Sequence, residues 1–290
     1  MTAKTITIFS CICGLLATFL RYLDLSLSND SILLEQNFQL STISIIICFI
    51  PSFVWFLFSR RKKRVGKVIN DDKNEIFGYV SFLMGFISLY CSYNFWHDYL
   101  NEINLNLQDI SIVGFSLSKP FAIITFIMAI YLISSGLIHL LKDNKIFEKL
   151  KIFELIPVFF GILLILYMYV HYSTALLISE NIFAIVGSCS LLLALLNKGK
   201  FLSKTDENLK SYNQTVFFTI LSCTLNGVYF YSNAFLNIVK SSELSQVPVL
   251  LQFLILSLSI YLLVFTLTAK SDIVKIVTSK PDNELRFKQN

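Results

Sequence analysis

The sequence is poor in charge. Asp, Glu, Lys and Arg make up 15% of its 290 residues, whereas apolar residues make up 55%. Soluble globular domains contain about 25% charged residues, so this composition excludes a soluble fold. The abundance of apolar residues also excludes intrinsic disorder, and six cysteines in a chain of this length do not make a small disulfide scaffold. The composition therefore predicts an integral membrane protein.

The sequence also lacks the common motifs of catalytic and nucleotide-binding domains. It contains no Gly-x-x-x-x-Gly-Lys, no His-Glu-x-x-His and no Gly-x-Ser-x-Gly. The longest segments between apolar stretches are 24–40, 60–74 and 96–119, and each is too short to bury a core of its own. The alternation in the second half of 96–119 fits a short strand and a surface helix equally well. Any chemistry must be performed within helices or at their ends, so an enzyme is the less favoured class.

Cysteine and histidine are not arranged for a cofactor. Cys11 and Cys13 have the wrong spacing for a zinc or Cys-x-x-Cys redox site. A haem or metal site at His97 and His171 would require their two helices to touch. We predict no catalytic site, no metal and no cofactor. All six cysteines fall inside apolar stretches, where they act as small apolar fillers: Cys11, Cys13, Cys48, Cys91, Cys189 and Cys223.

Long apolar stretches dominate what remains. A helix needs about 20 mostly apolar residues to cross the hydrocarbon core. The stretches are apolar on nearly every side, which excludes the alternating strands of a β-barrel. The sequence therefore predicts an all-α transmembrane bundle over 1–269, followed by a basic cytoplasmic tail over 270–290. Eight stretches qualify, here called spans one to eight: 5–23, 41–59, 75–95, 120–141, 153–172, 177–197, 212–235 and 247–269.

The basic residues set the predicted orientation. With both termini in the cytoplasm, 21 of the 24 Lys and Arg residues lie on the cytoplasmic side, as the positive-inside rule requires. These charges are spread over short loops and do not predict a nucleic-acid surface. The basic run at 60–64 is a topology signal that can also bind anionic lipid headgroups. We expect a multi-pass protein of a cell membrane, most consistent with a bacterial cytoplasmic membrane.

Two spans carry polar or small residues along one face. Small and hydrogen-bonding residues collect at helix interfaces in membranes. Span three therefore has a seam that should pack against another helix, and the stripe on span seven must face the bundle interior or water. The stripe is either helix-packing contact or the lining of a path. The seam consists of Gly78, Ser81, Gly85, Ser88 and Ser92, and the stripe of Thr215, Thr219, Ser222, Asn226, Tyr229 and Asn233.

Two further residues are candidates for function within the membrane. Pro51 lies near the middle of span two and frees the carbonyl of Ile47, which predicts a kink and a possible gate. Glu180 lies near the start of span six and is the one carboxylate that we place below the membrane surface. It is either a functional group or a cap at the interface.

The outer ends of spans three, five and seven are rich in tyrosine and histidine. Aromatic belts at membrane interfaces explain most such residues. If these ends are neighbours, they would form an outward-facing vestibule for a small amphipathic or cationic ligand. Their likeness also hints at a hairpin repeated four times. The substrate-binding candidates are Glu180, Asn226, Tyr229, His97, His171, Tyr93 and Tyr169.

The end of span one carries a family resemblance. The segment 14–21 closes with Leu20 and Arg21, and Asp30 follows nine residues later. This resembles uncharacterised eight-span membrane proteins of Gram-positive bacteria, in which an Asp-Pro-x-x-Gly turn stands at that distance. Here Ser31 replaces the proline and Leu34 the glycine. The resemblance implies the eight-span architecture and no activity. Independently of it, Arg21 and Asp24 are one helical turn apart and can form an ion pair.

Three functions fit this sequence. The first is a small-solute transporter or permease, whose path is formed by the span-seven stripe, the kinked span two and the vestibule. The second is an accessory or sensory subunit that packs beside a membrane partner or a second copy of itself. The third is an intramembrane enzyme acting on lipid. For the enzyme, only the sparse outer set Arg21, Asp24, His97, Asp98, His171 and Glu180 is at hand.

Overall fold

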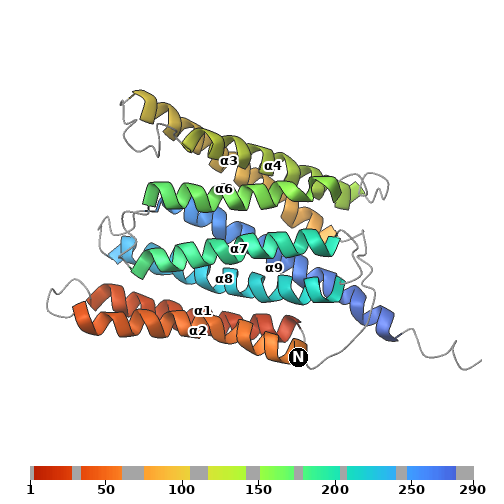
Figure 1. The fold of residues 1–290 in the computed structure, drawn as a ribbon, viewed down its shortest axis with the longest axis horizontal. Helices are drawn as coiled ribbons and strands as arrows, with labels where there is room; N and C mark the ends of the chain where they lie inside the picture. The colour runs from red at the N-terminus through yellow and green to blue at the C-terminus, as the bar shows by residue number, and fades with distance from the viewer. Residues whose placement is uncertain are drawn as a thin grey trace, which may run out of the picture.

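The computed structural model is all-helical over the residues that it describes, which are 3–27, 34–60, 75–104, 117–141, 151–172, 179–202, 208–239 and 247–278. This part of the chain contains no strand. The helices run back and forth along one direction (Figure 1). They are α1 (Ala3–Leu27), α2 (Leu34–Arg60), α3 (Glu75–Asn104), α4 (Ser118–Leu141), the 3-10 helix η1 (Lys151–Glu154), α6 (Leu155–Tyr172), α7 (Ser179–Leu202), α8 (Asn208–Val239) and α9 (Val249–Thr278).

The predicted all-α membrane architecture is confirmed. Each of the eight predicted spans overlaps one of the α-helices in the described part of the chain. Six of these helices, α1, α2, α3, α4, α7 and α9, are long and apolar enough to cross a membrane. The apolar part of α6 is shorter, at Leu155–Val170. Helix α8 is long but interrupted by polar residues, and its polarity is explained by its surroundings.

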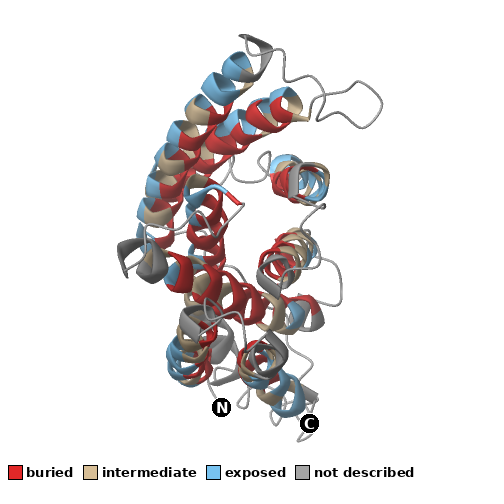
Figure 2. Cartoon of the chain, turned by 90° about the vertical axis from the view of Figure 1, so that its left-hand side faces the viewer, coloured by how far each residue is buried: buried red, intermediate tan, exposed pale blue. Residues whose placement is uncertain are grey.

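Helices α8 and α9 lie inside the bundle. Helix α8 packs against α1, α2, α7 and α9, and α9 also packs against α3 and α7. The pairs α1–α2 and α3–α4 lie toward opposite sides of the molecule (Figure 1). Buried residues face the middle of the assembly, while exposed ones face outward (Figure 2). A helix enclosed on several sides can carry polar residues that lipid would not tolerate.

The small-residue seam of α3 packs against α4, as the sequence predicted. A Cβ atom at Gly85 would lie 2.5 Å from Ile133 Cγ1, and one at Gly136 would lie 2.8 Å from the backbone nitrogen of Phe82. Ser81 donates a hydrogen bond to the Leu132 carbonyl at 2.9 Å. The absence of side chains at the glycines lets the two backbones approach, and hydroxyl-to-carbonyl bonds then join them.

Helix α2 joins α8 in a similar way. Trp55 Nε1 donates to the Asn213 carbonyl at 3.1 Å, and Ser52 donates to the Phe217 carbonyl at 3.2 Å. Thr224 Oγ1 of α8 donates to the Cys48 carbonyl at 3.3 Å. Pro51 is buried between these contacts, and α2 continues through it without interruption. Its suggested role as a gate stays a prediction.

The cysteines are all free thiols. Cys13, Cys48 and Cys91 are buried, Cys189 and Cys223 are half-buried, and Cys11 is exposed on α1. This agrees with their interpretation as apolar fillers.

Several predictions concern residues outside the described part of the chain. These are the second half of the 96–119 segment, the short turn between spans five and six, the basic run after Arg60, and the end of the tail from 279 onward. The first half of the 96–119 segment continues α3 as far as Asn104.

Candidate functional site

A column of buried polar side chains follows the contact between α8 and α9. The predicted stripe on α8 faces the bundle interior along its full length. This confirms the prediction that its polar residues are kept away from lipid. Buried polar residues of α9 lie on the other side of the contact. The α8 members are Thr215, Thr219, Ser222, Asn226, Tyr229 and Asn233, and the α9 members include Gln252, Ser259 and Thr266.

The centre of the column is a hydrogen-bonded cluster around Asn226. Its Nδ2 atom lies within hydrogen-bond distance of Ser222 Oγ at 3.0 Å, Ser259 Oγ at 3.3 Å and the Gly187 carbonyl of α7 at 3.3 Å. The two serine hydroxyls are 2.8 Å apart. Gly187 is required here, since a Cβ atom at this position would lie 2.2 Å from Asn226 Oδ1. The cluster therefore joins α7, α8 and α9.

The column has further polar contacts on both sides of this centre. Asn233 Nδ2 donates to Gln252 Oε1 at 3.4 Å, and Gln252 Nε2 donates to the Val247 carbonyl at 2.8 Å. In the other direction, the Thr219 hydroxyl is buried and has no hydrogen-bond partner among the described residues. A buried hydroxyl without a partner is costly, so Thr219 marks the point where the column is least satisfied.

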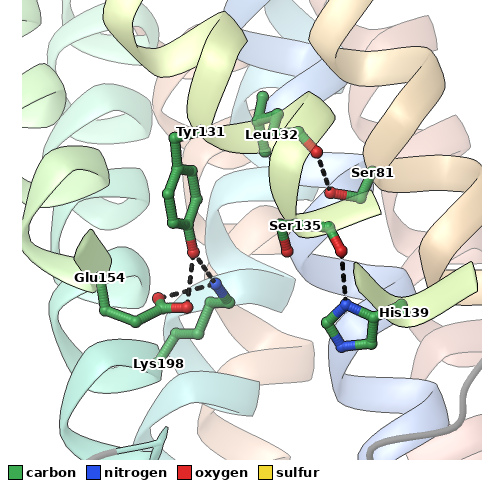
Figure 3. A network of polar contacts seen from close by, with 7 residues as sticks. All are labelled: Ser81, Tyr131, Leu132, Ser135, His139, Glu154 and Lys198. Atoms are coloured by element: carbon green, nitrogen blue, oxygen red, sulfur yellow. Dashed lines mark hydrogen bonds and ion pairs between the residues drawn. The ribbon is translucent and has the colours of Figure 1, made fainter. Parts of the chain in front are cut away.

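A buried ion pair forms a second cluster near the predicted cytoplasmic end of the bundle (Figure 3). Lys198 Nζ of α7 lies 2.9 Å from Glu154 Oε2 of η1. The Tyr131 hydroxyl of α4 donates to Glu154 Oε1 at 2.5 Å, and Lys198 Nζ donates to the Tyr131 oxygen at 3.2 Å. Each carboxylate oxygen of Glu154 thus accepts a hydrogen bond from its own donor, Oε1 from Tyr131 and Oε2 from Lys198. Pairing and hydrogen bonding together are what make a buried charge tolerable.

Aromatic rings enclose the ammonium group of Lys198. Its nitrogen lies 5.6 Å from the centre of the Tyr131 ring, 5.3 Å from that of Tyr261 and 5.5 Å from that of Phe265. Ring faces stabilise a cation electrostatically. The Tyr261 hydroxyl is buried next to Lys198, Glu154 and Tyr131, and no described atom lies at both hydrogen-bonding distance and angle from it. Tyr261 follows Ser259 by two residues on α9, so the two clusters lie at neighbouring levels of this helix but on different faces of it.

This cluster consists of residues that the sequence analysis did not select. That analysis placed Glu180 as the one carboxylate below the membrane surface, which stays a prediction, whereas the structure shows Glu154 and Lys198 buried within the protein. Each stands at the edge of a predicted span: Glu154 is the second residue of 153–172, and Lys198 directly follows 177–197. A charge at a span boundary is normally assigned to the interface. The available signal was the placement of one acidic and one basic residue at span ends predicted to lie on the same side.

A second buried ion pair lies at the opposite end of the bundle. Arg21 and Asp24 of α1 form the predicted ion pair, and both side chains are buried. The Arg21 guanidinium also lies 5.4 Å from the centre of the Phe183 ring of α7. The ends of α1 and α7 that carry Arg21 and Lys198 are far apart along the bundle (Figure 1).

Three of the other predicted binding residues, Tyr93, Tyr169 and His97, do not come together with Asn226. Tyr93 and Tyr169 are 68% and 55% exposed, so their rings face outward from the bundle. His97 is exposed, and its Nδ1 atom lies 3.1 Å from Asn101 Nδ2 one turn later. Tyr229 is buried on the same face of α8 as Asn226. Glu180 and His171 lie in helices, but their side chains fall outside the described residues.

An aromatic cluster does join two of the predicted vestibule helices. The Tyr167 ring of α6 stacks on Phe121 of α4 with centroids 4.4 Å apart, and its centroid lies 6.5 Å from that of Phe95 of α3. These rings are buried and pack against one another. They form a hydrophobic contact between helices. The exposed residues Tyr93 and Tyr169 are not part of this contact.

The described side chains include no group of three His, Cys, Asp or Glu residues that could hold a metal ion. His139, the third histidine, is buried in α4, with Nδ1 2.7 Å from the Ser135 carbonyl and its ring against Phe77. This contact fixes the imidazole within the α3–α4 region. The arrangement as a whole offers polar binding groups and two buried cation–carboxylate pairs. Comparison with known protein families, curated proteins and solved structures gives no match for this chain.

Proposed function

We propose that this membrane protein is a transporter of small polar solutes and that the solute path follows the buried polar column between α8 and α9. The observation that carries the proposal is the continuity of the column. Hydrogen-bonding side chains extend from Asn233 and Gln252 through Asn226 to Tyr212, which donates to the Thr266 carbonyl at 2.9 Å.

The unpartnered hydroxyl of Thr219 supports the same proposal. Within lipid or tightly packed protein, that group lacks compensation for its lost hydration. A polar solute passing along the column would supply the missing hydrogen bond. Asn226 offers both a donor and an acceptor one and a half to two turns further along α8, so the two residues can hold a solute in succession. The outward-facing aromatic vestibule of the sequence analysis remains part of the proposal at the outer end.

The experiment is uptake by proteoliposomes that contain the purified chain. A panel of radiolabelled amino acids, sugars, polyols and short carboxylates is offered to wild-type protein and to Asn226→Leu, which keeps the side-chain size and removes its polar groups. Ser92→Ala is the matched control, because it also removes one buried hydroxyl bond, at 3.0 Å to the Ala122 carbonyl, but in the α3–α4 contact.

The proposal predicts that at least one solute enters wild-type vesicles faster than protein-free vesicles. Asn226→Leu should lose most of that uptake, and Ser92→Ala should keep it. Uptake that is equal in wild-type and Asn226→Leu vesicles would place the path elsewhere. If no solute of the panel enters faster than into protein-free vesicles, the transporter proposal fails.

A second candidate is the accessory subunit, and the outer face of α3 favours it. Tyr79, Phe86 and Tyr93 recur every seven residues on that face, with Tyr90 beside them, and all four are exposed. Tyrosine hydroxyls that point into hydrocarbon lack partners, and a helix of another protein would cover them. Affinity purification from native membranes in mild detergent distinguishes the two. A stoichiometric membrane partner that is lost in a Tyr79→Leu, Tyr90→Leu variant would favour the subunit.

A further inference from the structure

We propose that the cluster of Lys198, Tyr131 and Tyr261 is a binding site for a small monocarboxylate solute, and that the Glu154 carboxylate occupies this site when the solute is absent. The inference deepens the proposed transport function by naming a substrate class. The binding itself is tested without any transport assay, so the two can fail separately.

The site encloses a single cation, the ammonium group of Lys198. Lys198 is 1% exposed and is surrounded by the rings of Tyr131, Tyr261 and Phe265. Two of its three N–H groups are directed to Glu154 Oε2 and to the Tyr131 oxygen. A buried ammonium needs an anion beside it. In this structure the anion comes from the protein's own chain, and a solute carboxylate has the same charge and geometry.

The Tyr261 hydroxyl beside Lys198 is a hydrogen-bond donor left unused by the described part of the protein. Tyr261 is fully buried beside Lys198, and its hydroxyl has no hydrogen-bond partner among the described residues. Glu154 accepts one bond from Tyr131 and one from Lys198, although an ionised carboxylate can accept about four. The carboxylate of a free solute is not attached to η1, so it can move to accept a hydrogen bond from Tyr261 as well. The cluster thus contains one donor more than Glu154 uses.

Glu154 lies on a surface segment. Its neighbours Phe153 and Leu155 are 52% and 60% exposed, whereas Glu154 itself is 9% exposed. The side chain of Glu154 keeps a relative exposure of 11%, against 2% for that of Lys198. The four-residue helix η1 therefore inserts one carboxylate from the surface, on the exposed side of the cation. Withdrawing that side chain opens the site without dismantling the helices around it.

The charge and the aromatic surroundings of Lys198 define the chemical class of the ligand. One cation balances one negative charge, and a dianion would bring a second charge into a site with no second cation among its described members. A neutral solute would leave the ammonium unpaired. The rings of Tyr131, Tyr261 and Phe265 lie beside the ammonium, so a short apolar tail that takes the place of the Glu154 side chain would contact them. These requirements together describe a monocarboxylate such as propionate.

The test is a thermal unfolding titration of purified, detergent-solubilised protein with sodium propionate replacing sodium chloride at constant ionic strength. Propionamide, which has the same shape without the charge, is the control ligand. Wild-type protein should show a saturable rise of the melting temperature with propionate and none with propionamide. Glu154→Gln keeps the side-chain size and removes the competing charge. This variant should reach half-saturation at about 10-fold lower propionate concentration. A 10-fold change corresponds to a wild-type site that Glu154 leaves vacant about a tenth of the time and that is always available in the variant.

Three further variants make the assignment specific. Glu154→Gln combined with Lys198→Met removes both charges and should abolish the response while avoiding an unpaired buried ion. Without propionate, Tyr261→Phe should lower the melting temperature less than Tyr212→Phe does, or raise it, and it should weaken the response to propionate. Asp24→Asn, at the buried pair on the opposite end of the bundle, should respond to propionate as wild type does.

The outcomes separate the site from the transport function. The site is refuted if neither wild-type protein nor Glu154→Gln responds to propionate, or if the doubly substituted variant responds as strongly as Glu154→Gln. A response that is much stronger to decanoate supports the carboxylate site and identifies its source as a fatty acid of the bilayer. Propionate binding without uptake into vesicles would refute transport and leave the site, and uptake of neutral solutes alone without propionate binding would refute the site and leave transport.

Discussion

Glu154 and Lys198 are 44 residues apart in the sequence, and their carboxylate and ammonium groups lie 2.9 Å apart inside the bundle. The pair connects η1, at the start of α6, to the last turns of α7, and Tyr131 adds α4 to the same contact. A charged pair in this position costs desolvation energy that well-packed apolar residues would not. Its presence therefore calls for an explanation beyond helix packing, which the proposed carboxylate site provides.

The first prediction concerns the energetic coupling of this pair. Lys198→Met or Glu154→Gln alone should destabilise the protein, by about 3–5 kcal/mol for Lys198→Met, because each leaves a buried charge without its partner. The combined variant should be less destabilised than the sum of the two. Unfolding in mixed detergent and denaturant measures all four proteins of the cycle. Strictly additive losses would show that the two groups do not interact.

The second prediction concerns the close approach of α3 and α4. Gly85→Ala should cost about 1–3 kcal/mol, because its Cβ would lie 2.5 Å from Ile133 Cγ1 and 3.0 Å from the Ile133 nitrogen. Gly14→Ala on α1 is the matched control, since nothing lies within 4 Å of a Cβ there. It should be neutral or stabilise by roughly 0.5–1 kcal/mol, as alanine does in a helix. Equal melting temperatures for the two variants would contradict the α3–α4 contact.

The third prediction concerns Gly187 and the centre of the polar column. Gly187→Ala should displace Asn226, whose Oδ1 atom would be 2.2 Å from the new methyl group. Both stability and solute uptake should fall. Shortening the neighbour in Gly187→Ala, Asn226→Ser should recover stability, since the methyl then has space, but not the full uptake. If the second substitution adds its own loss of stability to that of Gly187→Ala, the two side chains are not in contact.

The fourth prediction compares two buried tyrosines. The Tyr212 hydroxyl donates to the Thr266 carbonyl, whereas the Tyr261 hydroxyl has no partner among the described residues. Tyr212→Phe should therefore cost about 0.5–1.5 kcal/mol, the net value of one hydrogen bond. Tyr261→Phe should cost less, or stabilise, because it removes an unsatisfied buried group. The reverse order of melting temperatures would show that the Tyr261 hydroxyl is bonded in the folded protein.

Sequence patterns were sufficient for the architecture because the bilayer imposes simple rules. Apolar length located every helix, and the spacing of Gly78, Ser81 and Gly85 identified the face of α3 that meets α4. The Thr215-to-Asn233 stripe identified the buried face of α8 for the same reason: polar groups are excluded from lipid. The pairing of Arg21 with Asp24 followed from their separation of three residues on one helix.

The sites depend on contacts between distant segments, which spacing does not encode. The sequence indicates only that Glu154 and Lys198 stand at span ends on the same side, and the hydropathy pattern assigned both to an interface. Tyr93 and Tyr169 were grouped with Asn226 because all three occur near outer helix ends or polar faces, but rotation about the helix axis turns the two tyrosines outward. A sequence defines the rotation of a helix about its axis only where its polar and apolar faces differ, and α6 is apolar nearly all round. On α3 the seam of small residues does define a buried face, and Tyr93 lies off that face.

A solute path along the α8–α9 column must open to water during function, and the accessibility of a cysteine at position 219 tests this. Thr219→Cys is introduced into a background whose native cysteines are replaced, and sealed vesicles are treated with a membrane-impermeant methanethiosulfonate reagent. Leu132→Cys, at a fully buried apolar position of α4, is the control. A solute path predicts that Cys at 219 is modified from at least one side of the membrane while Cys at 132 is protected. Equal protection of both positions would show that the column is closed packing and would contradict the proposed function.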